Sequence, residues 1–433
     1  MKMSYELKDV KPYTPIAGMK EVRADVLQNP GEPVYPVDDV APLVGMAPTF
    51  VRKVLGHGGL LSRSEVVELL DQDAFAETFV PRSRVLAFLE SRQPEPEKVS
   101  MSGNVIGCAR DLAQRLEPGS IQTIVTSTPY WAMRVYEDMS PTTWADGEVC
   151  PYGLEQTPEG FIRHSIEMLY YLKPALHESG SVWWNLGDTY STRTQIRSNA
   201  SEALHAMQGR DRKNWHDHAV RRYSAGHSYL VDGEQCLIPQ RIAERASRIG
   251  YLIKSMISWV KTASLPEPQQ SRVSRNVEQI IHLTVQRTPL FDRAIYHELG
   301  ADIGGRSKWE TGKLSDSWIL PTSAGRGGHG AQFPLALPGR CIALSSRPGD
   351  IVLDPFMGSG TTAVAAEHLG RTWLGFEISP TYAAGMVERL RAQPALLSYE
   401  HLRRQVTPDT ADAFLEDVVV EDGQLDSESL RAV

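Results

Sequence analysis

Two short stretches of the sequence combine residue types that could do chemistry. Ser127-Thr128-Pro129-Tyr130 joins a small hydroxyl to a proline turn and an aromatic ring. Asp354-Pro355-Phe356-Met357-Gly358-Ser359-Gly360-Thr361-Thr362 joins a carboxylate to a loop that two glycines break. Gly358 and Gly360 would let backbone N–H groups approach a ligand with no Cβ in the way. A helix that begins behind such a loop favours a carboxylate or a phosphate at its N-terminus.

The residues around the glycine loop predict a strand, a tight turn and a helix. Ile351–Leu353 is a short apolar run, and Ala363–Leu369 has the composition of a helix that stops at Gly370. Arg371–Phe376 predicts a second strand, which delivers Glu377 as an acid able to accept hydrogen bonds from ribose hydroxyls. Together these residues predict a nucleoside pocket.

The glycine loop alone leaves its ligand open. Gly358, Gly360 and Ala363 also fit the dinucleotide spacing, so a nicotinamide cofactor and S-adenosylmethionine are both compatible with it. No lysine follows the second glycine, which excludes a nucleotide-triphosphate loop. A glycine turn without a ligand, in some parallel sheet, is the third interpretation.

Further apolar segments complete an α/β pattern. We expect strands at Asn104–Gly107, Ile121–Thr126, Gly180–Asp188, Leu252–Val260 and Val277–Thr284, and helices at Phe161–Leu172 and from Pro239 to about Ile249. Ser127 directly follows one of these strands. In open α/β sheets ligands bind at the carboxyl ends of the strands, so Ser127 stands where a ligand would sit.

Length and charge fit a large enzyme-sized domain that could bind DNA. The chain has 433 residues and a formal net charge of −8. Eight acids and one arginine follow Pro408, so the remainder of the chain is near neutral. Because nucleic-acid binding depends on a local basic face, the total charge does not exclude DNA.

Cysteine usage and hydropathy indicate a cytoplasmic protein. The four cysteines, Cys108, Cys150, Cys236 and Cys341, are too scattered for a zinc pair or a disulfide framework. The sequence contains no signal peptide and no long apolar run, so we expect no association with a membrane.

The N-terminal part predicts a small helical module. Val40–Val44 and Phe50–Leu55 fit two short helices joined by a glycine turn, which resembles a helix-turn-helix. Arg52 and Lys53 would lie on the second helix, where such motifs contact DNA. A helical module that only packs against the rest of the protein is an equally good interpretation.

A basic segment interrupts the regular pattern. Between Ser191 and His227 seven basic residues stand against three acids, without helical or strand periodicity. Such a run is usually a solvated loop, but beside a DNA-modifying pocket it could contact backbone phosphates. Arg221 and Arg222 are the candidates for such contacts.

The two chemical stretches, in this order, resemble the amino-group DNA methyltransferases of bacterial restriction-modification systems. The catalytic motif precedes the cofactor motif, which is the permuted order called class β. Further matches are Trp184–Asp188, Trp259–Lys261 followed by Pro266–Pro268, Arg272 with Asn276–Glu278, and Gln332–Pro334 ahead of Arg340. The resemblance spans about Asn104 to Leu390.

This resemblance implies a Rossmann-like α/β methyltransferase fold with a mostly parallel, seven-stranded sheet, and S-adenosylmethionine as the cofactor, without a metal. The cofactor-binding residues that it implies are Asp354, Pro355, Phe356, Gly358, Ser359, Gly360, Thr361, Thr362, Glu377 and Phe333. Thr128 replaces the usual proline of the catalytic motif, and its backbone carbonyl can still serve. Cys108 stands where the family commonly has an acid that contacts adenine.

The domain organisation follows from the same resemblance. Residues 1–98 form the helix-turn-helix-like module and a linker, and residues 99–400 form the methyltransferase domain. Inserted DNA-recognition segments are expected at about 189–236 and 286–320. Residues 401–433 form an acidic C-terminal tail.

The implied reaction needs a base flipped out of double-stranded DNA, because its exocyclic amine is stacked and paired in the duplex. The Ser127 hydroxyl and the Thr128 carbonyl would accept the two amine hydrogens and direct the nitrogen lone pair at the methyl group. Pro129 would stiffen the turn, and Tyr130 would stack on the base. A serine at position 127 favours cytosine N4 over adenine N6.

Two other classes of function remain as alternatives. A nicotinamide-dependent oxidoreductase would use the same glycine loop but gives no reason for Ser127–Trp131. A DNA-binding regulator with an inactive methyltransferase domain would explain the N-terminal module. For a methyltransferase of this type, a cognate restriction endonuclease and a dimeric state are the further partners to consider.

Overall fold

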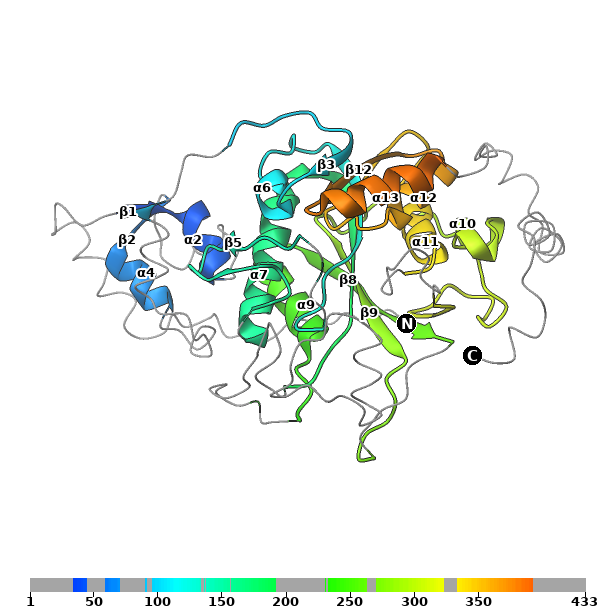
Figure 1. Cartoon of the computed structure of the whole chain (residues 1–433), viewed down its shortest axis with the longest axis horizontal. Coiled ribbons are helices and arrows are strands. Elements are labelled where there is room, and N and C mark those ends of the chain that lie inside the picture. The colour runs from blue at the N-terminus through cyan, green and yellow to red at the C-terminus, as the bar shows by residue number, and fades with distance from the viewer. Residues whose placement is uncertain are drawn as a thin grey trace, which may run out of the picture.

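The computed structural model describes residues 34–44, 59–70, 90–91, 96–133, 136, 138–155, 157–191, 230, 233–262, 270–322 and 333–391. An eight-stranded sheet runs through the centre of this part of the chain (Figure 1). In spatial order its strands are β10 (Ser317–Leu320), β8 (Leu252–Lys261), β9 (Val277–Thr284), β7 (Leu176–Leu186), β4 (Ile121–Ser127), β11 (Ile351–Asp354), β12 (Thr372–Glu377) and β3 (Gly103–Ile106). Only β9 runs antiparallel to its neighbours, β7 and β8, and all other pairs are parallel.

The expected Rossmann-like α/β fold is confirmed, whereas the expected number of seven strands is wrong. The additional strand is β10, which lies parallel to β8 with Trp318 opposite Trp259. Burial explains this strand, because the side chains of Trp318 and Leu320 are almost wholly excluded from solvent. Part of the segment at 286–320 is therefore built into the sheet, and its role in DNA recognition stays a prediction.

Buried Arg340 holds the chain that leads to β10. Its guanidinium donates to Gly304 O at 2.7 Å and Gly305 O at 2.6 Å, and pairs with both carboxylate oxygens of Glu310. The short helices α10 (Ile295–Glu298) and η3 (Ala301–Ile303) precede this anchor, and Arg340 itself lies on α11 (Ala336–Ser345).

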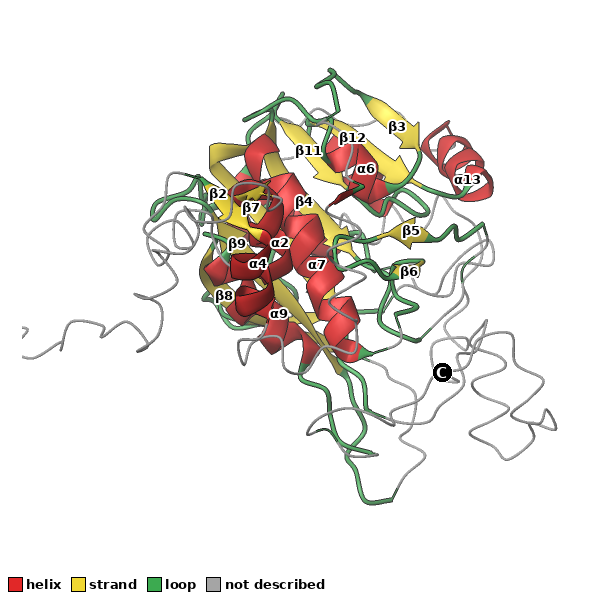
Figure 2. Cartoon of the chain, turned by 90° about the vertical axis from the view of Figure 1, so that its left-hand side faces the viewer, coloured by secondary structure: helices red, strands yellow, loops and turns green. Residues whose placement is uncertain are grey.

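Helices cover both faces of the sheet because successive strand residues point to opposite sides. On one face Ile124, Val182 and Ile281 pack against α7 (Pro158–Leu172) and α9 (Ile238–Arg248). On the other face their neighbours Val125, Trp183 and Ile280 pack against α11 and α12 (Thr361–His368). Figure 2 shows α7 and α9 in front of the strands. The sheet is thus buried on both sides, as its apolar strands require.

The two helices of the first face begin at defined caps. Thr157 accepts a hydrogen bond from Gly160 N at 3.0 Å, and Pro158 opens α7. Asp188 accepts from Leu237 N at 3.0 Å and from Ile238 N at 2.9 Å, and so caps α9. Glu159 then joins the two helices through an ion pair with Arg245 at 3.0 Å.

The N-terminal part contains a two-stranded sheet in addition to the expected helices. Strands β1 (Val34–Pro36) and β2 (Leu60–Ser62) pair antiparallel and lead into α2 (Val37–Val44) and α4 (Arg63–Leu70). The alternating burial at Val34–Pro36 fits a strand with one face packed, which short helical periodicity did not reveal. Arg52 and Lys53 lie outside the described residues.

This module packs against α7, one of the helices that cover the first face of the sheet. The hydroxyl of Tyr170, on α7, donates to Asp38 O of α2 at 2.6 Å. Ser62 caps α4: it accepts from Glu65 N at 3.2 Å, and the Glu65 carboxylate accepts from Ser62 N at 2.8 Å. Figure 1 shows α2 and α4 on the far side of α7 from the sheet.

The remaining described elements are short or lie at the sheet edge. They are α6 (Ala109–Ala113), the antiparallel pair β5 (Thr142–Thr143) and β6 (Val149–Cys150), the 3-10 helix η1 (Lys173–Ala175), and α13 (Pro380–Arg391). Among the helices described here, none has the length and apolar character needed to cross a membrane.

Candidate active site

The carboxyl ends of three neighbouring parallel strands meet at one cavity. Ser127 ends β4, Asp354 ends β11 and Glu377 ends β12. The cavity encloses about 1100 Å³ when its open mouth is included. Its lining contains these residues that the sequence predicts as site residues: Ser127, Pro129, Phe333, Pro355, Phe356, Gly358, Ser359, Thr361 and Glu377.

Asp354 organises the loop from beneath and does not line the cavity. Its carboxylate accepts from Thr126 Oγ1 at 2.7 Å, from Phe356 N at 3.0 Å and from Thr362 Oγ1 at 2.5 Å. Burial raises the pKa of Asp354 to about 6, although these hydrogen bonds favour the charged form. Asp354 and Thr362 therefore join β4, β11 and α12.

The two glycines of the loop serve different purposes. Gly358 has φ +54° and lines the cavity, with no side chain packed where a Cβ would stand. Gly360 has φ +81°, and a Cβ there would lie 2.2 Å from Met386 Cγ on α13. Gly360 thus permits close helix packing, whereas Gly358 keeps the cavity wall open.

Glu377 lies between the two loops that flank the cavity. Its carboxylate accepts from Gly358 N at 2.7 Å and from Ser379 N at 2.9 Å, and burial raises its pKa. Each carboxylate oxygen has further acceptor capacity on the side of the cavity. The pocket thus offers a carboxylate acceptor, an open backbone segment and aromatic walls, which fits the nucleoside-bearing cofactor expected from the sequence.

Arg389 holds two predicted cofactor residues from the side of α13. Its guanidinium donates to Thr361 Oγ1 at 3.0 Å and to Ser359 Oγ and O at 3.3 Å. The sequence gave no indication of this contact, because α13 follows the loop only after another strand.

The opposite wall comes from the chain between β4 and α7. Tyr152 stacks on Phe356 with ring centroids 5.0 Å apart, and Trp144 and Thr142 lie in the same wall. Cys108, at the position where the resemblance implies an acid, lies 3.3 Å from Thr142 Oγ1 and also lines the cavity. The wall is mostly apolar, which suits a flat aromatic ring.

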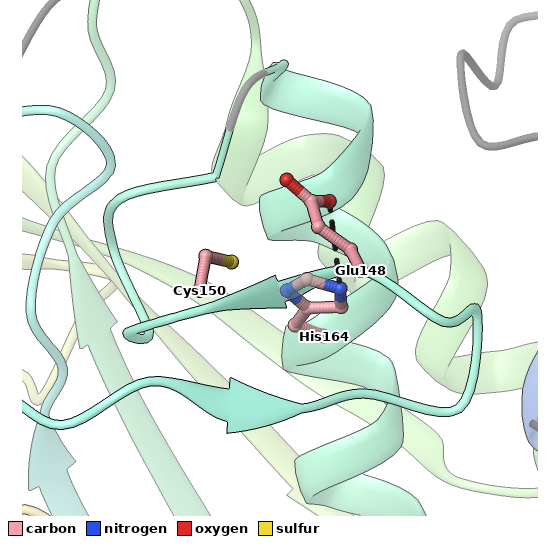
Figure 3. A group of neighbouring side chains, drawn as sticks. All are labelled: Glu148, Cys150 and His164. Carbon is pink, nitrogen blue, oxygen red and sulfur yellow. Dashed lines mark ion pairs between the residues drawn. The ribbon is translucent and has the colours of Figure 1, made fainter.

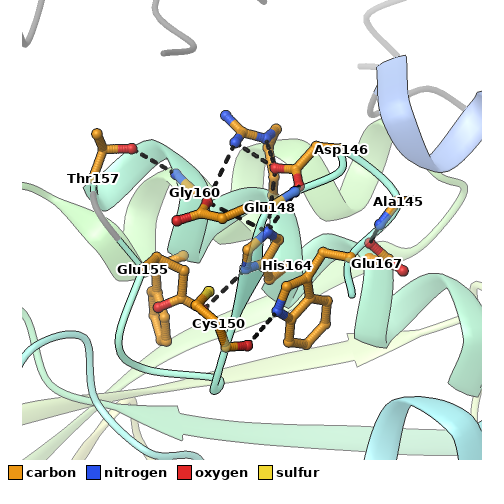
Figure 4. Close-up of polar contacts among 12 residues, drawn as sticks. Ala145, Asp146, Glu148, Cys150, Glu155, Thr157, Gly160, His164 and Glu167 are labelled. Atoms are coloured by element: carbon orange, nitrogen blue, oxygen red, sulfur yellow. Dashed lines mark hydrogen bonds and ion pairs between the residues drawn. The ribbon is translucent and has the colours of Figure 1, made fainter. Parts of the chain in front are cut away.

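A buried ionic cluster supports this wall from behind: Asp146, Glu148, Glu155, Arg163 and His164 (Figure 4). His164 Nδ1 lies 3.1 Å from Glu155 Oε1, and Nε2 lies 3.2 Å from Asp146. The imidazole stacks on Trp144 at 4.2 Å and is fully buried. Arg163 completes an ion pair with Asp146.

Electrostatics favour the charged forms of His164 and Asp146, whereas burial raises the pKa of Glu155. Burial alone would lower the pKa of His164, but the charge of Asp146 and its hydrogen bonds raise that pKa well above its ordinary value. Burial opposes ionisation of Asp146 as well, yet Arg163 and His164 hold its pKa below its usual range. The imidazole is therefore a cation at neutral pH.

Three side chains of this region could in principle hold a metal ion. Glu148, Cys150 and His164 offer ligand atoms within 4.8 Å of one another (Figure 3). However, carboxylates engage both ring nitrogens of His164, and burial raises the pKa of the Cys150 thiol to about 12. These contacts make the group a closed ion-pair network.

A second polar group, the strand-end cluster, consists of Ser127, Tyr130, Asn185, Glu278 and Lys261. Asn185 Nδ2 lies 3.2 Å from Ser127 Oγ, 2.9 Å from the Tyr130 hydroxyl and 3.0 Å from Glu278 Oε2. The Tyr130 hydroxyl donates to Glu278, which also pairs with Lys261. Ser127 Oγ and the Tyr130 hydroxyl are 3.3 Å apart.

Strand pairing brings the strand-end cluster together. Glu278 lies near the start of β9, which runs antiparallel beside β7, so it faces the end of β7 where Asn185 lies. Lys261 comes from the end of the next strand, β8. In the sequence, Asn185, Glu278 and Lys261 stand out only because they belong to segments that resemble the family. The sequence does not show that they are neighbours, because this depends on the order of the strands.

Thr128 and Tyr130 flank Pro129, which lines the cavity, but they do not line it themselves. Thr128 is buried and its N–H donates to Asn185 O at 3.3 Å. The Tyr130 ring lies against Gly187, where a Cβ would be 3.0 Å from the ring. Catalytic roles for Ser127, Thr128, Pro129 and Tyr130 stay predictions.

The predicted DNA contacts at Arg221 and Arg222 lie outside the described residues. The described chain instead places two other arginines beside the strand ends. The guanidinium carbons of Arg272 and Arg275 lie 3.8 Å and 4.7 Å from the centroid of the Tyr190 ring, and Arg275 also donates to Asp188 O.

The chain is similar to known proteins of one family. A family model described as DNA methylase matches residues 121–388. The type II methyltransferase M.Cfr9I of Citrobacter freundii is 30% identical over 317 residues, which cover 72% of this chain and 95% of that protein. The type II methyltransferase M.SmaI of Serratia marcescens is 27% identical, with coverage of 66% and 89%. A solved structure, PvuII DNA methyltransferase (cytosine-N4-specific), is 19% identical with a TM-score of 0.47, over 74% of this chain and 94% of that chain.

Proposed function

The chain belongs to the DNA methylase family, the amino-group methyltransferases of restriction-modification type, and from this premise we propose that it methylates the exocyclic N4 of cytosine. The target base is flipped out of double-stranded DNA. S-adenosylmethionine is the cofactor, and when bound it supplies a methyl group activated by a positively charged sulfur. The loop 354–362, Glu377 and Phe333 would hold it.

The observation that carries the assignment to cytosine is the hydroxyl of Ser127 at the cavity wall. Its neighbour Asn185 can direct an amide hydrogen at Ser127 Oγ, which leaves a lone pair of that oxygen for an amine hydrogen of the substrate. A serine is smaller than the aspartate that accompanies adenine N6 in the resemblance. The Thr128 carbonyl would accept the second amine hydrogen.

Positioning supplies most of the catalysis in this proposal. The amine nitrogen is a weak nucleophile, and two accepted hydrogen bonds draw it toward tetrahedral geometry with its lone pair aimed at the methyl carbon. Pro129 lines the cavity and shapes the turn, and Tyr130 contacts Ser127 through its hydroxyl from outside the cavity. We also propose that a cognate restriction endonuclease acts on the same DNA site and that this protein forms a dimer.

Adenine N6 is the second candidate, and one contact favours it. Glu278 brings a carboxylate into the strand-end cluster through Tyr130 and Asn185, so an acid is present although position 127 is a serine. Glu278 does not line the cavity and contacts Tyr130, which does not line it either. Cytosine therefore remains the better fit.

Mass spectrometry of nucleosides from the DNA of an expressing host tests the proposal. N4-methylcytosine is the expected product, because the residue that ends β4 at the cavity is Ser127 and not an aspartate. N6-methyladenine would overturn the choice of base but leave the class of enzyme intact. DNA without either modified base, from a host that makes folded protein, would favour a DNA-binding regulator with an inactive domain.

A further inference from the structure

Methyl transfer to an amine leaves the nitrogen with one proton more than the neutral product carries. When the amine nitrogen forms its bond to the methyl carbon, the carbon–sulfur bond breaks and its electron pair stays on sulfur. The nitrogen then carries a positive charge and must lose a hydrogen as a proton. Ser127 can accept a hydrogen bond, but a serine hydroxyl cannot keep a second proton at neutral pH, so an acceptor beyond it is needed.

The hydrogen bonds of the strand-end cluster run in one direction. Glu278 Oε2 is an acceptor only, so the Tyr130 hydroxyl donates to it. With its hydrogen committed, Tyr130 can only accept from Ser127, at 3.3 Å. Burial, followed by the charge of Glu278, raises the pKa of Tyr130 well above its ordinary value, so the phenol keeps its hydrogen between transfers.

We propose that Glu278 is the terminal proton acceptor of the reaction, reached from the substrate amine through the hydroxyls of Ser127 and Tyr130. The amine proton passes to Ser127 Oγ, the Ser127 proton passes to Tyr130, and the Tyr130 proton passes to Glu278. Both hydroxyls end as they began, and Glu278 becomes a neutral carboxylic acid. This inference rests on the proposed methyl transfer and holds for either target base.

The neighbours of Glu278 suit this role. The charged or titratable groups that face it are Lys261 from β8 and Tyr130 from the loop after β4, and Asn185 of β7 adds an amide. The Lys261 ammonium forms an ion pair with the Glu278 carboxylate. The Glu278 side chain is 12% exposed, which gives the proton a path to water afterwards.

Lys261 and Asn185 are positioning residues in this scheme. Asn185 fixes both hydroxyl oxygens relative to Glu278, since its amide lies within 3.2 Å of all three. Gly187 leaves room for the Tyr130 ring, because a Cβ there would stand 3.0 Å from it. The close approach of Tyr130 to β7 thus requires a residue without a side chain.

The test uses the full-length protein, tritiated S-adenosylmethionine and genomic DNA from a host that lacks methylation, under single-turnover conditions. Glu278→Gln keeps the size of the side chain and should lower the rate about 100-fold or more, as loss of a proton acceptor does. Tyr130→Phe removes the middle hydroxyl and should act similarly. The double variant should be no slower than the slower single variant, because both changes break one chain.

Two readouts separate proton transfer from a structural role. The pH profile of the wild-type rate should differ from that of Glu278→Gln, because only the wild type ends the path in a carboxylate. Affinity for S-adenosylmethionine should stay within about twofold. Matched controls are Glu178→Gln, at the far end of β7, and Tyr251→Phe, whose hydroxyl donates to Leu169 O at 2.9 Å.

The outcomes distinguish this inference from the proposed function. Glu278→Gln with the wild-type rate and pH profile would overturn the proton path while methyl transfer stands. A wild-type protein that transfers no methyl group to DNA would overturn both. Should Glu278→Gln not fold, Tyr130→Phe carries the test, and a wild-type rate in that variant likewise overturns the path.

Discussion

The strand-end cluster and the buried ionic cluster are both connected to the turn that follows β4, but they differ in how they satisfy their charges. In the buried ionic cluster, His164 has a carboxylate on each ring nitrogen and is fully enclosed. In the strand-end cluster, Ser127 borders the cavity, and the amide oxygen of Asn185 is buried without a partner among the described residues. The first arrangement suits rigid support, whereas the second leaves capacity for a substrate.

One chain of contacts connects the two clusters. Glu155 binds His164 and also accepts from Gly153 N at 3.0 Å. Gly153 O in turn accepts from Ala132 N at 2.8 Å, next to the catalytic loop. The buried ionic cluster is thus linked to the backbone that presents Pro129 and Tyr130.

The largest expected effect comes from breaking the buried ionic cluster. His164→Ala removes the cation between Asp146 and Glu155 and leaves the buried Glu155 carboxylate without its cationic partner, whereas Asp146 keeps Arg163. The free energy of unfolding should fall by about 3–5 kcal/mol, the usual result of removing one member of a buried pair. Urea denaturation measures it. His177→Ala, an exposed histidine on β7, is the control and should change stability by less than about 0.5 kcal/mol.

The pH dependence of stability sharpens this prediction. The pKa of His164 is raised in the folded protein, so its contribution is complete below about pH 6.5, the unfolded value, and is lost as pH rises through the folded value. Urea midpoints of the wild type should therefore fall on the alkaline side more than those of His164→Ala. Parallel curves for the two proteins would mean that the imidazole is neutral.

A smaller effect is expected at Glu377, which faces the cavity. Glu377→Ala removes a carboxylate that holds Gly358 N and that we expect to bind ribose hydroxyls. Affinity for S-adenosylmethionine should fall by about 1–3 kcal/mol, the cost of buried polar groups left unpaired. Calorimetry measures this change, with Glu388→Ala on the exposed side of α13 as the control. Unchanged affinity would remove Glu377 from the cofactor site.

The smallest effect concerns the surface beside the strand-end cluster. If Arg272 and Arg275 contact DNA phosphates, replacing both by glutamine should flatten the dependence of DNA affinity on salt, by up to about 0.9 in log–log slope for each lost contact. Arg248→Gln, at the end of α9, is the matched control. The Arg221→Gln/Arg222→Gln pair tests the basic segment in the same titration. If the slope of a double variant equals that of the wild type, the two arginines replaced in that variant do not contact DNA phosphates.

Local sequence predicted the parts of the site that a single strand and its loop supply. The strand before Ser127, the glycine loop and the strand before Glu377 have strong apolar patterns and short connections, so their order at one sheet edge follows from the fold class. The structural role of Asp354 could not be predicted from the local sequence. Its partners Thr126 and Thr362 show that it fixes the loop, which depends on tertiary contacts.

Sequence could not predict which residues meet across strands. Asn185, Glu278 and Lys261 become neighbours only through the antiparallel pairing of β9 with β7 and β8, and register is set by the whole sheet. The edge strand β10 and the pair β1 and β2 were missed because segments of three or four residues carry too little periodicity. The cap of α9 by Asp188 could not be predicted either, because Asp188 is far from Ile238 in the sequence.

The most direct test of the account is the methyl-transfer rate of Ser127→Ala beside its affinity for S-adenosylmethionine. The hydroxyl is expected to act on the substrate amine and not on the cofactor loop. The single-turnover rate should therefore fall about a hundred- to a thousandfold, or about 3–4 kcal/mol, while calorimetry gives an affinity within about twofold of the wild type. Ser315→Ala, an exposed serine before β10, should match the wild type in both. Transfer by Ser127→Ala at the wild-type rate would contradict the account, because the strand-end cluster would then not be the catalytic site.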